Sequence, residues 1–126
     1  AASDVYKRQV MKPITKYSDN TGGGSNTASY VTSTTDYLPL LSEFEVQGAR
    51  SYANSAEQNY QQQYAYYQAG NSKVHYKHGR TGTVALAWCR SVYATNTNIF
   101  CLVGTDGSAD TNNANHSWAV APGFAA

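Results

Sequence analysis

The sequence is short of charged residues and has no long apolar run. Lys, Arg, Asp and Glu make up 13% of its 126 residues, about half the usual share. The formal net charge is +1, which gives no reason to expect a nucleic acid as partner. No apolar stretch approaches the length of a bilayer span, so membrane insertion is not expected. The length suits one domain with one core.

Motifs that identify enzymes and metal proteins are missing as well. The sequence has no glycine-rich phosphate loop, no His-Glu-x-x-His pair and no nucleophile elbow. Asp106 and Asp110 lack the ligand spacing of an EF-hand. The two cysteines and three histidines form no recognisable ligand or triad pattern. We therefore predict no catalytic residue, no metal ligand and no cofactor.

The two cysteines, Cys89 and Cys101, fall on neighbouring predicted strands among apolar residues. Three states are open to them. Buried free thiols come first, a cross-strand disulfide second and a catalytic pair third.

Tyr, Asn, Ser and Thr are abundant instead, most clearly from Ser91 to Ser117. Two charged residues, Asp106 and Asp110, occur in this window, and it contains no Lys, Glu, Gln, Met or Trp. Small polar side chains with a few aromatics are the composition of a binding surface. The alternative is two ordinary surface loops. We predict that the ligand-binding residues lie here, exposed and on one surface: Tyr93, Asn96, Asn98, Asp110, Asn112, Asn113, Asn115 and His116.

Local patterns predict an α+β fold with short helices, antiparallel strands and long loops. Ser42 and Glu45 form a capping box for a helix that ends near Gly48. A second helix is expected from Asn54 to a stop at Gly70-Asn71, and Asp106-Gly107 signals a hairpin. A short strand or an extended arm is expected at Val10 to Lys16. Strands are expected at Lys73 to Lys77, Thr83 to Cys89, Asn98 to Gly104 and Trp118 to Phe124. Loops are expected at 17–35 (apart from a short strand at Ser29 to Thr32), 91–97 and 109–117.

Two groups of residues have more than one interpretation. Ala56, Tyr60, Tyr64 and Tyr67 follow helical spacing; we predict that they face the core, although such a stripe can also be a stacking platform for sugars. His75, Lys77, His78 and Arg80 are predicted to be a solvated strand face and turn, with an anion site as the alternative. The predicted core comprises Leu41, Phe44, Val46, Tyr60, Tyr64, Leu86 and Trp88.

The N-terminal segment has an unusual sequence. Asp4-Val5-Tyr6-Lys7-Arg8-Gln9 resembles, in one reading frame, a transposon end used in preparing sequencing libraries. We therefore predict that residues 1–9 are an adapter scar, and that 10–126 are the C-terminal part of a single domain from a 5′-truncated, metagenomic gene.

An ordered set of short motifs resembles a family of uncharacterised domains from gut bacteria and their prophages, often in tail or surface proteins. The motifs are Leu40 to Val46 with Gly48, Gln63 to Tyr67 with Gly70-Asn71, Trp88-Cys89-Arg90-Ser91, and Val120 to Phe124. Where that family usually reads Trp-Leu-Arg-Ser-Pro, this sequence has Cys89 and Val92 instead.

More distantly, the set is similar to the formylglycine-generating-enzyme and C-type-lectin superfamily. The catalytic cysteines and the calcium-sugar signature of that superfamily have no counterparts here, so the resemblance implies the scaffold alone. It also implies that the first strand of the domain pairs with the last strand, which here would be Trp118 to Phe124. The predicted truncation would remove that first strand. One branch holds the variable proteins of diversity-generating retroelements, whose rewritten window excludes Lys, Glu, Gln, Met and Trp. Residues 92–117 obey that exclusion, and Trp118 would then be framework.

These observations together predict a non-catalytic binding module of a phage tail or bacterial surface protein. Its partner would be a cell-surface protein or a glycan, bound through the loops of 91–118, and its location the virion or the bacterial surface. One alternative is a diverged enzyme of the formylglycine-generating type that uses Cys89 or Cys101. Another is a structural virion domain without a ligand.

Overall fold

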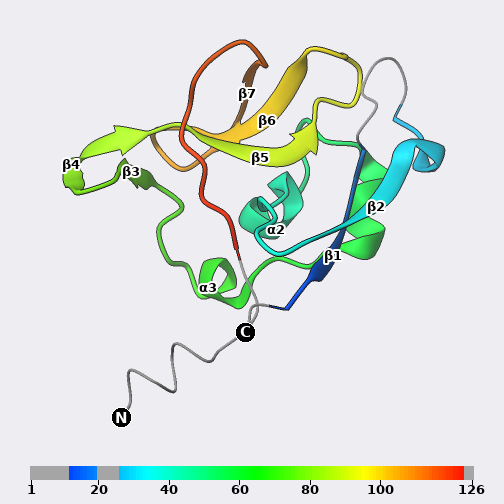
Figure 1. The fold of residues 1–126 in the computed structure, drawn as a ribbon, viewed down its shortest axis with the longest axis horizontal. Helices are drawn as coiled ribbons and strands as arrows, with labels where there is room; N and C mark the ends of the chain where they lie inside the picture. Colours follow the sequence, from blue (N-terminus) through cyan, green and yellow to red (C-terminus); the bar gives the residue numbers. More distant parts are fainter. Residues whose placement is uncertain (1–11, 20–25, 124–126) are drawn as a thin grey trace.

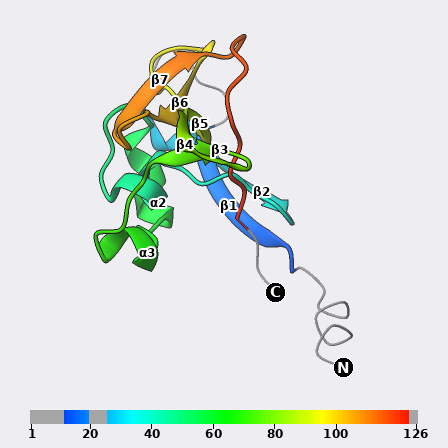
Figure 2. The same ribbon diagram turned by 90° about the vertical axis from the view of Figure 1, so that its left-hand side faces the viewer.

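The protein folds into a mixed α+β structure in which strands form three small antiparallel sheets. The computed structural model describes residues 12–19 and 26–123. A three-stranded sheet lies above the helices α2 and α3, and the pair β1–β2 lies beside them (Figures 1 and 2). The predicted fold class, α+β with antiparallel strands, is confirmed at this level.

The N-terminal part forms more regular structure than its sequence predicts. β1 (Ile14–Asp19) and β2 (Val31–Asp36) pair antiparallel along their full length, and a short 3-10 helix, η1 (Ala28–Tyr30), leads into β2. The prediction of a loop at 17–35 is therefore wrong for most of the described residues. The polar side chains of β2 hide the strand pattern, because β2 is exposed along nearly its whole length. The predicted residues Val10 and Met11 and the glycines 22–24 lie outside the described residues.

Helix α2 (Glu43–Gln47) forms as its local sequence predicts. The Ser42 hydroxyl accepts a hydrogen bond from the Glu45 amide (3.1 Å), and Glu45 accepts one from the Ser42 amide (3.0 Å). This capping box satisfies two amides that a helix start leaves free. Gly48 ends the helix at φ 75°, in the left-handed region that glycine adopts without steric cost.

The predicted second helix exists only in two pieces. Asn54 caps the 3-10 helix η2 (Ser55–Tyr60), and the α-helix α3 (Ala65–Gln68) follows before Gly70. Between them the chain is extended, because its polar groups bind the end of α2. The Tyr64 amide donates to the Glu45 carbonyl (3.0 Å), and Gln63 Nε2 donates to the Val46 carbonyl (3.0 Å). Those carbonyls would otherwise be unpaired at the helix C-terminus.

The strands of the second half agree with the predictions in part. β3 (His75–Lys77) pairs with β4 (Arg80–Ala85), and the chain then continues through β5 (Ala87–Val92) to β6 (Ile99–Val103) and β7 (Ala109–Asn113), in the order β5-β6-β7. The Asp106-Gly107 turn between β6 and β7 is confirmed, with Gly107 at φ 86°. The predicted loop at 109–117 is wrong for its first half, since β7 pairs with β6 over five residues. Lys77, His78 and Arg80 are exposed, as predicted for a solvated turn, whereas His75 is half-buried.

The predicted closing strand at Trp118 to Phe124 is wrong for its described residues, 118–123. A single parallel bridge joins Ala119 to Ala87 on the outer edge of β5. There the Ala119 amide donates to the Leu86 carbonyl and its carbonyl accepts from the Trp88 amide, both at 2.9 Å. Beyond it, the Gly123 amide donates to the Pro39 carbonyl (2.9 Å), so the segment leaves the sheet edge. Phe124 lies outside the described residues.

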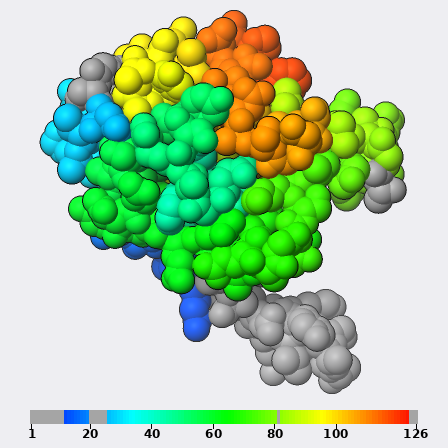
Figure 3. All heavy atoms as spheres, turned by 180° about the vertical axis from the view of Figure 1, so that it is seen from behind, coloured from blue at the N-terminus to red at the C-terminus, as the bar shows by residue number. Residues whose placement is uncertain are grey.

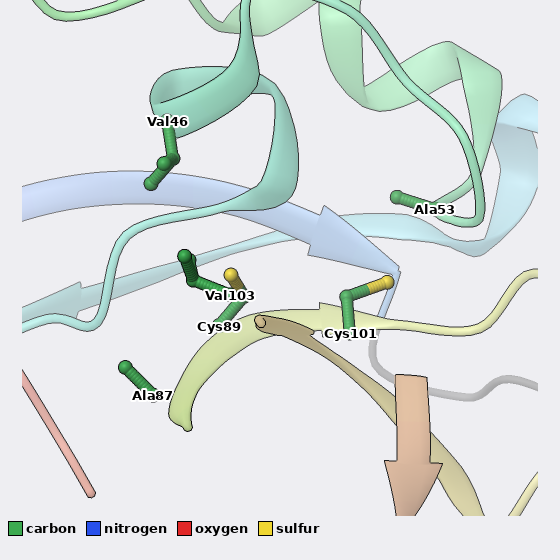
Figure 4. Packing of buried hydrophobic residues seen from close by; sticks show 6 residues of the cluster. All are labelled: Val46, Ala53, Ala87, Cys89, Cys101 and Val103. Atoms are coloured by element: carbon green, nitrogen blue, oxygen red, sulfur yellow. The ribbon is translucent and has the colours of Figure 1, made fainter. Parts of the chain in front are cut away.

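The core uses the opposite face of the β4–β5 segment from the one predicted. Ala85, Ala87 and Cys89 are buried, at 8%, 2% and 4% exposed, whereas Val84 is 41% exposed. Leu86 and Trp88 are half-buried on the other face. Both faces of this segment are apolar, so alternation alone does not select one. The short side chains let α2 and the loop at Ala53 approach the sheet closely (Figure 4). Val46 is in the core as predicted, Tyr60 is exposed, and Leu41, Phe44 and Tyr64 are half-buried.

Candidate functional site

Below the three-stranded sheet, four acidic residues of the part of the chain that the structure describes are buried: Asp19, Glu43, Glu45 and Glu57. Glu43, on α2, is 1% exposed and accepts hydrogen bonds from three consecutive backbone amides. The distances are 2.7 Å from Ser51, 3.1 Å from Tyr52 and 2.7 Å from Ala53. Buried carboxylates persist where hydrogen bonds replace water. Glu43 therefore holds the 51–53 loop against the helix, which is a structural role.

Glu45 joins the helix to two cations. Its Oε1 accepts from Lys16 Nζ (2.6 Å) and its Oε2 from Arg90 Nη1 (2.8 Å). Arg90 also donates to the carbonyls of Leu40 (2.7 Å) and Tyr17 (3.2 Å). Burial alone would raise the pKa of Glu45. The hydrogen bond and the charge of Arg90, together with the hydrogen bonds from Lys16 and the Ser42 amide, outweigh the effect of burial. They hold the pKa of Glu45 below its usual range.

Glu57, on η2, has a different environment because no cation among the described residues bonds to it directly. It accepts from the Asp19 amide (2.8 Å), the Ser91 hydroxyl (2.8 Å) and Gln61 Nε2 (3.3 Å). Burial raises the pKa of Glu57, and these hydrogen bonds only partly offset it. Ser91 also accepts from the Glu43 amide (3.2 Å). Arg90 and Ser91, from the Trp-x-Arg-Ser motif, thus connect β5 to both helical segments.

The two cysteines are free and buried, as predicted. Cys89 and Cys101 lie between α2 and the sheet (Figure 4). Burial raises the pKa of Cys89 to about 12 and raises that of Cys101 as well, with the nearby Glu43 carboxylate adding to both shifts. A nucleophilic thiol needs access and a lowered pKa, and these thiols have neither.

At the other end of the sheet, the two predicted loops come together. The β5–β6 loop and the segment after β7 both lie at the top of Figure 1, and the Ala114 amide donates to the Asn98 carbonyl (2.9 Å). Asn98, Asn113 and Asn115 line a shallow hollow of about 310 Å³ with Ala114. All three asparagines are exposed. The structure therefore brings together these three of the predicted residues from loops that are separate in the sequence.

A second hollow lies beside the first and is mainly apolar. Its volume is about 360 Å³, and Leu40, Trp88, Phe100 and Ala114 are among the residues that line it. The Trp88 and Phe100 rings meet edge to face, with centroids 6.2 Å apart. Ala114 lines both hollows, so the amide-rich and aromatic surfaces adjoin. Apolar walls with a few polar groups at the rim are typical of ligand sites.

Other predicted residues hold the loops in shape. The Asn96 side chain accepts from the Asn98 amide (3.2 Å), and Asn112 accepts from the Asn113 amide (2.8 Å). Tyr93 is half-buried, and its ring contacts Tyr52 with centroids 5.8 Å apart. Asn96 and Asn112 are also half-buried. Each of these side chains thus supports the loop backbone as well as contributing to its surface.

The last two predicted residues lie apart from the asparagine hollow. Asp110 is exposed and pairs with Leu102 across the β6–β7 ladder. It lies three residues before Asn113 on β7, nearer to the Asp106-Gly107 turn. His116 is exposed and stacks on Trp118, with centroids 5.5 Å apart and planes 13° from parallel. Ser91 and Val92, at the start of the predicted window, are buried in β5, so the exposed part begins at Tyr93.

Sequence reasoning missed the aromatic contribution from Trp88 and Phe100. Both were read as parts of apolar strands, and nothing local marks which face of a strand meets solvent. Within residues 12–19 and 26–123, no group of three His, Cys, Asp or Glu side chains is placed to hold a metal ion. None of the helices described there has the length and apolar character needed to cross a bilayer.

The fold and its exposed end define a small α+β domain with a buried carboxylate network and an asparagine-rich loop surface. Residues 3–125 match the family described as Domain of unknown function (DUF6273). The chain belongs to this family. No curated protein and no solved structure matches it.

Proposed function

We propose that this domain is a non-catalytic binding module of a phage tail or bacterial surface protein, and that it binds its partner through the loop end. The observation that carries the proposal is the adjoining pair of hollows at Ala114. One offers the Trp88 and Phe100 rings and the other the exposed amides of Asn98, Asn113 and Asn115. Aromatic rings supply contact area, and neutral amides supply hydrogen bonds at little desolvation cost.

The hydrogen bonds of the loops support this proposal. The Ala114–Asn98 hydrogen bond joins the two loops, and the Asn96 and Asn112 side chains each bond to the backbone of their own segment. Loops held on a sheet lose little conformational entropy on binding. A C-type-lectin-like scaffold with a diversified window of 92–117 belongs to the same proposal. It is supported by the exposure of Asn98, Asn113, Asn115 and His116 within that window. Other residues of the window, among them Val92, Ala94 and Cys101, are buried and belong to the framework.

The rival function, an enzyme of the formylglycine-generating type, requires a reactive thiol. Burial and the raised pKa values of Cys89 and Cys101 argue against one. We expect a disulfide reagent at neutral pH to label neither thiol in the native protein and both after denaturation. Rapid labelling of one thiol in the native state would favour the enzyme.

Binding is tested with the fluorescently labelled domain on a panel of intact gut bacterial cells and immobilised cell-surface glycans. The test variant is Asn98→Ala/Asn113→Ala/Asn115→Ala. The control changes three exposed polar residues elsewhere, Thr34→Ala/Gln58→Ala/Asn59→Ala. We expect saturable binding that the test variant weakens by about tenfold or more and the control leaves within about twofold. Absence of binding to any surface would favour the structural virion domain, and equal loss in both variants would contradict the loop site.

A further inference from the structure

A second hollow surface lies away from the loop end, between β1 and the segment that runs from η2 to α3. It is an open groove of about 540 Å³, and its walls include Lys16, Tyr60, Gln62, Tyr64, Tyr66 and Gln68. None of its lining residues lines the two hollows of the loop end. Figure 3 shows that the green part of the chain, which contains η2 and α3, makes up much of the molecule's surface when it is seen from behind. This groove is therefore a separate surface.

Two tyrosine rings on the groove face solvent. Tyr60 belongs to the stripe that is predicted to face the core, and for this residue the prediction is wrong; Tyr66 lies outside that stripe. Tyr60 is 55% exposed and Tyr66 is 59% exposed. Each ring packs against a second tyrosine ring. Tyr60 stacks on Tyr17 with centroids 4.5 Å apart and planes 13° from parallel, and Tyr66 meets Tyr67 edge-on at 5.2 Å. A ring held from one side offers apolar contact on the other at little entropic cost.

The charges of the groove are already paired with each other. Lys16 Nζ lies 2.6 Å from Glu45 Oε1, and the remaining side of Glu45 binds Arg90. Lys16 also donates to the Tyr64 hydroxyl (3.0 Å), so that oxygen is the acceptor in this bond and the hydroxyl keeps its own proton as a donor. Gln62 and Gln68 are exposed at the rim and supply both donors and acceptors. The groove thus offers rings and neutral hydrogen-bonding groups.

We propose that this groove binds a neutral oligosaccharide. Sugar rings present apolar C–H faces that pack on aromatic rings and hydroxyls that both donate and accept, which is the combination that Tyr60, Tyr66, the Tyr64 hydroxyl and the glutamine amides match. An acidic sugar would need a cation that is not already neutralised, and Lys16 is occupied by Glu45. The inference goes beyond the proposed function, since it concerns a different face and does not depend on the loops.

The test is titration of the whole domain by isothermal calorimetry and ligand-observed NMR with four neutral trisaccharides: cellotriose, maltotriose, mannotriose and chitotriose. A hyaluronan tetrasaccharide serves as the acidic comparator. We expect saturable binding of at least one neutral trisaccharide and weaker binding of the acidic one. Tyr66→Ala should weaken that binding about tenfold, as loss of an aromatic anchor does. Tyr60→Phe should preserve it within about threefold, because the ring remains.

The chain offers matched controls. Tyr37 and Tyr76 are 55% and 50% exposed but do not line the groove. We expect Tyr37→Ala and Tyr76→Ala to bind within about twofold of the parent. If none of the four neutral trisaccharides binds, if the acidic one binds better, or if a control weakens binding as much as Tyr66→Ala, the proposal is wrong. The loop variant Asn98→Ala/Asn113→Ala/Asn115→Ala should keep trisaccharide binding, which separates failure of this site from failure of the loop site.

Discussion

The two ends of this molecule use their polar residues in opposite ways. Below the sheet, Asp19, Glu43, Glu45 and Glu57 are at most 3% exposed, and they accept hydrogen bonds from backbone amides, side-chain amides, hydroxyls and cations of the same chain. At the loop end, Asn98, Asn113 and Asn115 are exposed around a hollow. These four carboxylates thus fix the fold, and the three asparagines are left for contact with other molecules.

The difference follows from the cost of burial. Burying a carboxylate without hydrogen-bond partners costs much free energy, so each group that bonds to a buried carboxylate must keep its position in the fold. An exposed asparagine exchanges protein hydrogen bonds for water at little cost. Substitutions should therefore be damaging below the sheet and tolerated at the loop end, in proportion to burial.

The largest effect is expected at Glu43. Glu43→Ala leaves the amides of Ser51, Tyr52 and Ala53 without their acceptor, and we expect it to reduce the free energy of unfolding by roughly 3–5 kcal/mol. Denaturant unfolding measures this. The control is Asp36→Ala, an exposed acidic residue on β2, which should change stability by less than about 0.5 kcal/mol. Equal effects of the two variants would mean that the buried carboxylates do not organise the fold.

The next effect tests which face of the β4–β5 segment is inside. Ala87 is 2% exposed between the sheet and α2, so Ala87→Leu should overpack the core and destabilise it by about 1–3 kcal/mol. Val84 is 41% exposed, and Val84→Leu should be neutral within about 0.5 kcal/mol. Thermal unfolding of the two variants compares them directly. If Val84→Leu destabilised the protein more than Ala87→Leu, the buried face would be the one that the sequence pattern predicts.

The pH dependence of stability should distinguish two of the buried glutamates. The pKa of Glu45 is lowered in the fold, so its contribution is present above the unfolded value near 4.5 and is lost as pH falls through the folded pKa. The pKa of Glu57 is raised, so its protonated form is favoured by folding. That contribution is complete below the unfolded value and is lost as pH rises through the folded pKa.

Glu45→Gln and Glu57→Gln measure these contributions against the parent. From about pH 3 to about pH 7, across the ordinary carboxyl range, the stability advantage of the parent over Glu45→Gln should grow. Its advantage over Glu57→Gln should shrink over the same range. Unfolding titrations at several pH values give both slopes, and two slopes of the same sign would contradict the assigned environments.

The smallest effect is expected at the loop end. Asn98→Ala, Asn113→Ala and Asn115→Ala should each alter the free energy of unfolding by less than about 0.5 kcal/mol, because their side chains are exposed. Asn96→Ala should cost more, about 0.5–1.5 kcal/mol, since its oxygen accepts from the Asn98 amide. Denaturant unfolding again gives the values. If substituting the three exposed asparagines lowers the free energy of unfolding as much as Asn96→Ala does, their side chains contribute to the stability of the fold.

Features set by neighbours in sequence could be predicted, and features set by distant contacts could not. The Ser42–Glu45 capping box, the stops at Gly48 and Gly70 and the Asp106-Gly107 turn each depend on a few adjacent residues. The break between η2 and α3 depends on groups of α2 that Gln63 and Tyr64 bind across space. β7 and β2 are polar strands, and their pairing shows in no local pattern.

The candidate site was predicted from composition, and its shape could not be. A window without long or charged side chains indicates where contact residues lie. It does not show that Asn98, Asn113 and Asn115 line one hollow, that Asn96 and Asn112 bond to the backbone, or that His116 stacks on Trp118. The shared hollow depends on the β6–β7 register, in which Ile99 pairs with Asn113.

The central claim is that the buried glutamates and their partners hold the fold, whereas the exposed asparagines of the loop end do not. A saturation library of residues 12–123 displayed on yeast and selected for protease resistance measures tolerance at every position in one experiment. We predict that Glu43, Glu45, Glu57, Arg90 and Ser91 tolerate almost no substitution and that Asn98, Asn113 and Asn115 tolerate nearly all. Equal intolerance at the two ends, or tolerance at the buried glutamates, would contradict the account.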